Sequence, residues 1–225
     1  MRSILPSFVL VASALIAPIT AQVVFQPPQN VPLRFLGVFL TNPELGDVDQ
    51  DGDLDVVYTT GAGPGGNIEI LLNDGSGGFT QGPIDPGFGG PQAADLHDMN
   101  GDRLPDYVLT LGTTVLVLLG DGEGSFDLGP GFTSTRPPNH IEAADVNGDT
   151  IPDIVFTSPI TPLFLLPATL QVWIGSSTST SYTLLGSQNL AGTPTDFDLA
   201  DVDGEGRLDA VIPRLGVATW HAGQA

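Results

Sequence analysis

The sequence predicts an all-β fold of four repeated units, and three observations carry that prediction. An acidic loop recurs with its first aspartate at residues 47, 98, 145 and 201, which gives steps of 51, 47 and 56 residues. A β-prone apolar run follows every loop. The 20 prolines and 29 glycines interrupt any amphipathic helix of useful length. A period of about 50 residues with strands inside each unit indicates a propeller or a solenoid.

All four loops carry oxygen-bearing side chains at positions 1, 3, 5 and 9 of a nine-residue segment. The segments are residues 47–55, 98–106, 145–153 and 201–209. A hard divalent cation takes six to eight oxygen ligands at about 2.3–2.6 Å. Alternate residues of a tight turn can aim carboxylates at one point, and a backbone carbonyl near position 7 can add a ligand. Asp, Asn and Gly also form ordinary turns, but four copies with the same oxygen positions favour a calcium site.

The loops differ from the EF-hand, which has a bidentate glutamate at position 12 and a helix on each side. Position 12 is apolar or aromatic in every copy here, namely Tyr58, Leu109, Phe156 and Ile212. Each of these residues lies in a β-prone run that begins directly after the position-9 aspartate. The loop is therefore predicted to lead into a strand.

Each unit contains a second apolar run, and three units have a turn that ends in an aromatic residue. The second runs are residues 68–72, 115–119, 170–174 and 217–220. The aromatic residues Phe79, Phe126 and Tyr182 each precede the next first-position aspartate by 19 residues. Successive residues of the runs are apolar, which is typical of strands covered on both faces. In a propeller every small sheet lies between two neighbours, so the pattern favours a propeller.

An aspartate-rich loop, a short strand, a second strand and the turn N-D-G-S-G-G-F at residues 73–79 together resemble the FG-GAP/VCBS repeat. This repeat also builds the integrin α propeller, and the resemblance covers about residues 25–225. It implies four-stranded antiparallel blades with up to four Ca²⁺ ions in the loops. The implied ligands are Asp47, Asp49, Asp51, Asp55, Asp98, Asn100, Asp102, Asp106, Asp145, Asn147, Asp149, Asp153, Asp201, Asp203, Glu205 and Asp209. The implied position-7 carbonyls are those of Asp53, Leu104, Ile151 and Arg207.

Three residues depart from the repeat pattern. Arg103 and Thr150 stand where the repeat usually has glycine at position 6, which predicts strain if that position needs a positive φ. Glu205 is one methylene longer than aspartate, so the fourth site is expected to be distorted. The first loop is predicted to bind Ca²⁺ most tightly, because its ligands are all aspartate and Gly52 occupies position 6.

Four loops are fewer than the roughly seven blades that the resemblance implies. The hypothesis drawn from the sequence is that a strand near Phe25 completes the last unit and closes a four-bladed ring. The alternative is an incomplete propeller that pairs with a second copy, or a truncated product. The expected state is thus a monomer or a homodimer that completes the propeller.

Residues 1–21 are predicted to be a secretory signal, with Arg2, an apolar stretch and small residues ending at Ala21. The stretch is too short to span a bilayer as a helix, although a short membrane anchor is the alternative. The domain is then residues 22–225, outside the cell or at its surface, without membrane insertion after cleavage. Cysteine is absent, so no disulfide framework supports export independently. The formal net charge of −20 argues against nucleic acid as a partner.

No catalytic constellation is evident in the sequence. The histidines His97, His140 and His221 stand outside any G-x-S-x-G or H-E-x-x-H motif and are interpreted as structural. Paired carboxylates could imitate a glycosidase, but fourfold repetition favours ion cages. Trp173 and Trp220 are expected in the core rather than stacked on sugar. The chain is therefore predicted not to be an enzyme.

The function predicted from the sequence is a secreted calcium-binding β-propeller repeat protein, a non-catalytic binding or adhesion module. Its expected partner is an extracellular protein or glycan. One alternative is a lectin or the accessory propeller of a polysaccharide-active enzyme. Another is a structural envelope or spacer protein.

Overall fold

The computed structural model describes residues 40–60, 66–86, 91–161, 166–176, 181–214 and 217–221. These residues form strands, turns and loops without a helix, and all of them belong to one compact unit, Leu33–Ala225. No helix in these ranges is long and apolar enough to cross a membrane. The predicted signal at residues 1–21, the strand near Phe25 and the side chains of Trp220 and His221 lie outside the described residues.

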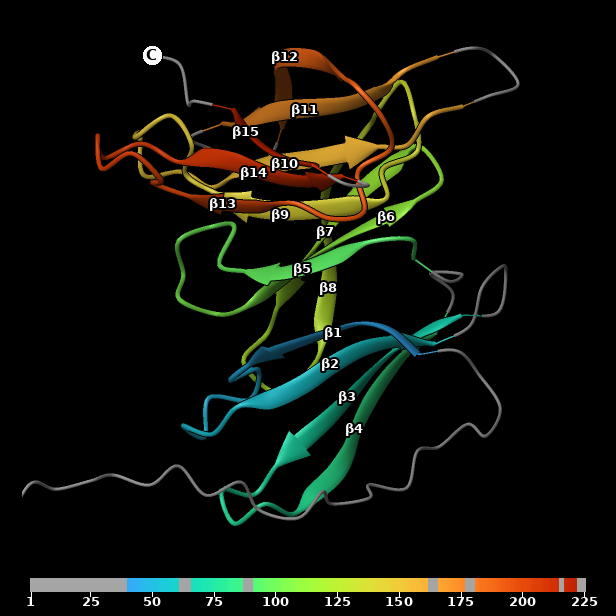
Figure 1. Cartoon of the computed structure of the whole chain (residues 1–225). Helices are drawn as coiled ribbons and strands as arrows, with labels where there is room; N and C mark the ends of the chain where they lie inside the picture. Colours follow the sequence, from blue (N-terminus) through green and yellow to red (C-terminus); the bar gives the residue numbers. More distant parts are fainter. Residues whose placement is uncertain are drawn as a thin grey trace, which may run out of the picture. The chain divides into compact units, whose positions relative to one another are not determined.

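The strands form four antiparallel sheets in chain order (Figure 1). Sheet 1 contains β1 (Leu40–Gly46), β2 (Asp55–Thr60), β3 (Asn67–Asn73) and β4 (Phe79–Pro86). Sheet 2 contains β5 (Ala94–His97), β6 (Asp106–Leu111), β7 (Thr114–Gly120) and β8 (Phe126–Thr133). Sheet 3 contains β9 (His140–Ala144), β10 (Asp153–Ser158), β11 (Ala168–Gly175) and β12 (Tyr182–Leu190). Sheet 4 contains β13 (Asp198–Ala200), β14 (Asp209–Arg214) and β15 (Val217–His221).

The first strand of each sheet contacts the first strand of the next sheet, in the order β1, β5, β9 and β13. This arrangement is propeller-like and confirms the predicted all-β fold of antiparallel four-stranded units. Within the described ranges sheet 4 has three strands, and no strand of sheet 1 pairs with it. The predicted closed four-bladed ring is therefore not observed in the described part of the chain.

Adjacent sheets bury apolar side chains against each other, and the second strands of sheets 2 and 3 contribute to both sides. On β6, Tyr107 and Leu109 pack in the cluster shared with sheet 1, whereas Val108 packs in the cluster shared with sheet 3. All three side chains are fully buried. Side chains of a strand alternate between the two faces, so a wholly apolar strand fits a sheet that is covered on both. The predicted two-sided burial is confirmed.

Trp173 supports the same conclusion for the third sheet. Its ring stacks on Phe132 of β8 with centroids 4.1 Å apart, and both residues pack against the cluster between sheets 2 and 3. The indole N–H donates to Gln171 Oε1 at 3.2 Å. Trp173 is thus a core residue, as predicted.

Candidate metal centres

Each acidic loop joins the first two strands of its sheet, and its position-1 carboxylate organises the turn. In the second loop, the Asp98 carboxylate accepts the backbone N–H groups of Gly101 at 2.7 Å and Arg103 at 2.8 Å. The same pair of contacts recurs on Asp145 and Asp201. The repeated spacing therefore encodes a repeated turn, in which the carboxylate of the first aspartate accepts hydrogen bonds from the backbone N–H groups of positions 4 and 6.

The position-9 aspartates are fully buried in all four loops, namely Asp55, Asp106, Asp153 and Asp209. One oxygen of Asp106 accepts the N–H of Met99 at 2.8 Å, and the other accepts the N–H of Gly120 on β7 at 2.9 Å. Burial, followed by nearby Asp102 and Asp98, raises the pKa of Asp106 to about 6 against the lowering effect of these two N–H groups. Position 9 thus anchors the loop to the third strand, a role that the sequence reading missed.

Positions 4 and 6 of each loop have left-handed backbone. Arg103 has φ of 73° and Thr150 has φ of 71°, so the condition under which the sequence predicted strain at these two positions is met. Gln50 at position 4 of the first loop also has a positive φ, of 59°. Non-glycine residues rarely adopt this conformation, and β-branched ones least of all. These three loops therefore carry local strain that a glycine would relieve.

Three carboxylates converge in the first loop and in the fourth. Oxygen atoms of Asp47, Asp49 and Asp55 lie within 4.8 Å of one another, and so do those of Asp201, Asp203 and Asp209. In the first loop, Asp47 Oδ1 is buried without a hydrogen-bond partner among the described residues. Burial and the neighbouring carboxylates Asp55, Asp51 and Asp47 raise the pKa of Asp49. An all-oxygen, mutually repelling donor set with an unpartnered buried atom fits a hard cation such as Ca²⁺.

The second and third loops differ because an asparagine occupies position 3. The Asn100 amide donates to Asp102 Oδ2 at 2.8 Å, and the Asn147 amide donates to Asp149 Oδ2 at 3.0 Å. Each amide therefore holds the position-5 carboxylate by a hydrogen bond. In the first loop both of these positions are aspartates, Asp49 and Asp51. Among the described residues, three acidic side chains with oxygens within 4.8 Å of one another occur only in the first and fourth loops.

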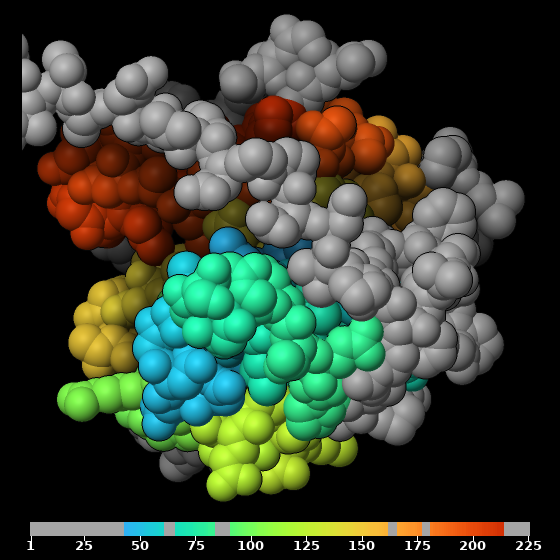
Figure 2. All heavy atoms as spheres, turned by 90° about the horizontal axis from the view of Figure 1, so that it is seen from below, coloured from blue at the N-terminus to red at the C-terminus, as the bar shows by residue number. Residues whose placement is uncertain are grey.

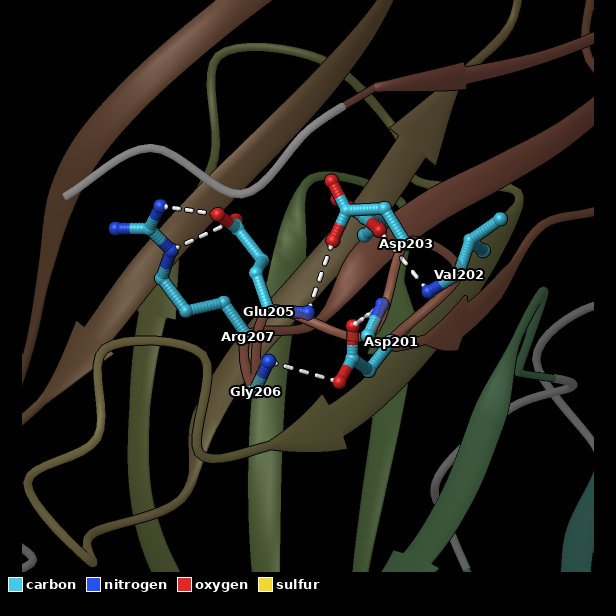
Figure 3. A network of polar contacts seen from close by, with 8 residues as sticks. Asp201, Val202, Asp203, Glu205, Gly206 and Arg207 are labelled. Atoms are coloured by element: carbon cyan, nitrogen blue, oxygen red, sulfur yellow. Dashed lines mark hydrogen bonds and ion pairs between the residues drawn. The ribbon is translucent and has the colours of Figure 1, made fainter.

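Glu205, the predicted position-5 ligand of the fourth loop, pairs with Arg207 (Figure 3). Arg207 Nε donates to Oε1 at 2.9 Å, and Arg207 Nη2 donates to Oε2 at 2.7 Å. Figure 3 shows the glutamate side chain extending away from the carboxylate of Asp201. The structure thus brings Asp201, Asp203 and Asp209 together but leaves Glu205 apart.

The turn between β7 and β8 of sheet 2 lies against the first loop of sheet 1. Gly124 N donates to the carbonyl of Val48 at 3.1 Å. A Cβ added to Gly124 would lie 3.4 Å from Leu72 and 3.9 Å from the Cβ of Asp49, so the approach is close. The loops therefore contribute to the junctions between sheets as well as to the candidate ion sites.

A second polar feature lies along the first strands of the sheets. An acidic residue stands three positions before every loop, at Glu44, Asp95, Glu142 and Asp198. The first three line a cavity of about 560 Å³, which His97, His140 and Asp196 also line. His140 Nδ1 is 3.3 Å from Asp196 Oδ1. The constant offset of these acids was available in the sequence and was missed.

The propeller-like series of sheets and its acidic loops define a repeat protein. Residues 47–109 and 98–156 match the model of the FG-GAP-like repeat family. Residues 47–156 of the chain therefore belong to the FG-GAP-like repeat family. No curated protein matches it significantly in sequence.

Solved structures of low sequence identity share the fold. A rhamnogalacturonan lyase PL11 from Bacillus licheniformis superposes with a TM-score of 0.57 at 15% identity, over 84% of this chain and 42% of the lyase. The exotype rhamnogalacturonan lyase YesX gives 0.55 at 15% identity, over 84% and 40%. BBS1N, solved in complex with ARL6DN, gives 0.50 at 13% identity, over 81% and 56%. The chain thus spans about two fifths of the length of the two lyases.

Proposed function

We propose that this protein is a calcium-binding, non-catalytic binding module that acts outside the cell. The observation that carries the proposal is the convergence of Asp47, Asp49 and Asp55, together with the buried Oδ1 of Asp47, which has no hydrogen-bond partner among the described residues. Ca²⁺ tolerates irregular, carboxylate-rich coordination, whereas Mg²⁺ demands a near-ideal octahedron. Bound Ca²⁺ would also offset part of the formal charge of −20. The sixteen loop residues named above remain the predicted ligands.

Titration calorimetry of chelator-treated protein with CaCl₂ tests the metal. Extracellular calcium modules bind at about 10⁻⁴–10⁻³ M, so the expected result is saturable binding of up to four ions in that range. The loops of Asp47 and Asp201 are expected to fill first, because their carboxylates already converge. Asp47→Asn should remove one ion from the stoichiometry. A titration without heat, together with a melting temperature insensitive to Ca²⁺, would contradict the proposal.

Export is the second part of the proposal, and it rests on the signal-like residues 1–21. When the full chain is expressed with a fluorescent fusion at its C-terminus, the protein should leave the cytoplasm and begin near Gln22. Amino-terminal sequencing of the recovered protein measures the cleavage point. An uncleaved chain held in the membrane would instead favour the anchor.

Glycan binding is a second candidate, favoured by the fold shared with two rhamnogalacturonan lyases. At 15% identity this likeness concerns the fold alone. Binding to rhamnogalacturonan oligosaccharides, measured with Ca²⁺ and with chelator, tests it. Calcium-dependent binding without new reducing ends or unsaturated products would support a lectin. Cleavage of the oligosaccharide would overturn the non-catalytic assignment.

A further inference from the structure

We propose that two copies of this chain dock head to tail, with the free face of sheet 4 of one copy on the free face of sheet 1 of the other. The proposal does not depend on the calcium assignment. It rests on repeat positions beside the loops, which are covered where a neighbouring sheet is present among the described residues and exposed at Leu45, Leu54 and Val202.

The first set of positions faces the preceding sheet. Two residues before the loop, Leu96 packs in the cluster between sheets 1 and 2, and Leu199 packs in the cluster between sheets 3 and 4. The equivalent residue of sheet 1 is Leu45, which is 63% exposed. Position 8 of the loop follows the same pattern. Pro105 of the second loop lies against sheet 1, 3.5 Å from a Cβ built on Gly46, whereas the equivalent Leu54 of the first loop is 57% exposed. Sheet 1, whose blue to teal residues lie at the near surface in Figure 2, thus presents two uncovered leucines beside its loop.

The second set faces the following sheet. At position 2 of the loop, Val48 is 3% exposed and Met99 is 2% exposed, because each packs against the next sheet. The equivalent Val202 of sheet 4 is 53% exposed. Position 11 is fully or almost fully buried in the first three sheets, but Val211 of sheet 4 is only half-buried. Sheet 4 thus presents an uncovered apolar surface at its own loop.

A polar contact follows the same pattern. Gly124 N of sheet 2 donates to the carbonyl of Val48 at position 2 of the preceding loop. The equivalent glycine of sheet 1 is Gly77, and among the described residues no atom lies within 4 Å of a Cβ built there. The equivalent carbonyl of sheet 4 belongs to Val202. A docked second copy would place its Gly77 N–H against this carbonyl, as Gly124 is placed within the chain.

A second copy is the occupant that these surfaces fit, because their complementary partner is already present in the chain. The free face of sheet 4 is equivalent to the face by which each of sheets 1 to 3 contacts the next sheet. The free face of sheet 1 is equivalent to the face by which each of sheets 2 to 4 contacts the previous sheet. Docking would therefore continue the loop side of an interface that the chain makes three times. Tyr58 and Leu71 of sheet 1 are buried at 3% and 6% exposure, so the uncovered part of that face is its loop side. Such a head-to-tail interface closes into a ring or continues as a chain of copies.

A cysteine pair tests the docking sharply, because the protein contains no cysteine of its own. The double variant Leu45→Cys and Val202→Cys, oxidised in millimolar CaCl₂ and run on a non-reducing gel, should form covalent dimers or higher oligomers that dithiothreitol releases. Leu128→Cys is the matched control, since Leu128 is 69% exposed and lies on β8 of sheet 2, which belongs to neither of the two docking sheets. An intramolecular disulfide, which would indicate a ring within one chain, or no disulfide above the control, would overturn the proposal.

Light scattering after size exclusion gives an independent measure with uncrosslinked protein. Unmodified protein should have at least twice the mass of one chain. The variant Leu45→Asn with Leu54→Asn, or the variant Val202→Asn, should each weaken self-association at least about tenfold, a change of about 1.4 kcal/mol. An equimolar mixture of the two should regain a dimer, because one of the two interfaces then keeps its native residues. A monomer for the unmodified protein, or a mixture no tighter than either variant alone, would overturn the docking even if Ca²⁺ binds.

Discussion

The carboxylate of Asp95 on β5 accepts a hydrogen bond of 2.6 Å from the backbone N–H of Ala143 on β9, in the neighbouring sheet. One sheet further on, Glu142 accepts the backbone N–H of Leu199 in the same way. Among the described strands, each first strand has a hydrogen-bonded partner strand on one side only. Its other edge would leave backbone N–H groups without strand partners, which proteins avoid in their interiors. A side chain three residues before the loop thus satisfies the edge of the next sheet.

Removing this carboxylate should weaken the junction between sheets 2 and 3. Asp95→Ala leaves the Ala143 N–H without its acceptor, so the free energy of unfolding should fall by about 1–3 kcal/mol. Asp95→Asn should cost less, because its carbonyl oxygen can still accept. Urea unfolding in CaCl₂ measures both, with Asp127→Ala at an exposed site on β8 as the control. Equal stability of the Asp95→Ala variant and the control would refute the role.

The acids of the 560 Å³ cavity predict a pH dependence of stability. Burial, followed by Asp95, raises the pKa of Glu44 from 4.5 to about 7. Burial, followed by Asp198 and Asp95, likewise raises the pKa of Glu142 to about 7. A carboxyl whose folded-state pKa lies above its unfolded value favours the folded state when protonated. Its contribution is therefore present below pH 4.5 and is lost as the pH rises through about 7.

Glu142→Gln should therefore stabilise the protein at pH 8 and leave it unchanged at pH 4. The gain should be on the order of 1 kcal/mol, because solvent screens a half-buried carboxyl. His140 and Asp196 face the same cavity; burial lowers the pKa of His140 against the raising effect of Asp196, so His140 is largely neutral at pH 8. Thermal melts at the two pH values, with exposed Glu123→Gln as the control, measure the difference. A gain that is equal at both pH values would show that burial of Glu142 does not drive it.

The strained position-6 residues predict two stabilising substitutions. Arg103 and Thr150 are exposed and have φ of 73° and 71°, so Arg103→Gly and Thr150→Gly relieve strain and lose little packing. Left-handed backbone costs a non-glycine residue roughly 1–2 kcal/mol, partly offset by the larger unfolded-state entropy of glycine. The expected gain is about 1 kcal/mol in the free energy of unfolding, larger at the β-branched Thr150.

Gly52→Ala, at the same position of the first loop with φ of 96°, is the reciprocal control and should destabilise the protein. Urea unfolding of all three variants measures the effects. If the glycine variants lose stability, the side chains of Arg103 and Thr150 contribute more than their backbone strain costs.

The parts of the fold that depend on local sequence were predictable. The order of loop, strand and second strand and the core position of Trp173 follow from spacing and residue type. Long-range relationships were not predictable in this way. Gly120 lies 14 residues from Asp106, and Ala143 lies 48 residues from Asp95, so neither contact has a local signature. All four loops have oxygen-bearing side chains at positions 1, 3, 5 and 9, so the sequence pattern did not reveal how their side-chain contacts differ.

Those differences appear in the fourth loop, where sequence spacing counted Glu205 as a ligand and the structure pairs it with Arg207. The guanidinium engages both carboxylate oxygens of Glu205, at 2.9 Å and 2.7 Å. The hydrogen bond with Glu205 raises the pKa of Arg207. A cation that recruits Glu205 must first separate it from Arg207, and the positive charge of Arg207 stands beside the incoming ion.

Arg207→Gln should therefore tighten Ca²⁺ binding at the fourth loop. Exposed ion pairs are weak, so the gain should be about fivefold at most and should shrink with added salt. Arg207→Lys is the matched control, because lysine keeps the charge but cannot form the bidentate contact. The Ca²⁺ affinity of this variant should lie between those of the unmodified protein and Arg207→Gln. Calorimetry in an Asp47→Asn background, which disables the first loop, isolates the effect. If Arg207→Gln weakens binding instead, Arg207 positions Glu205 or the position-7 carbonyl for the ion rather than competing with it.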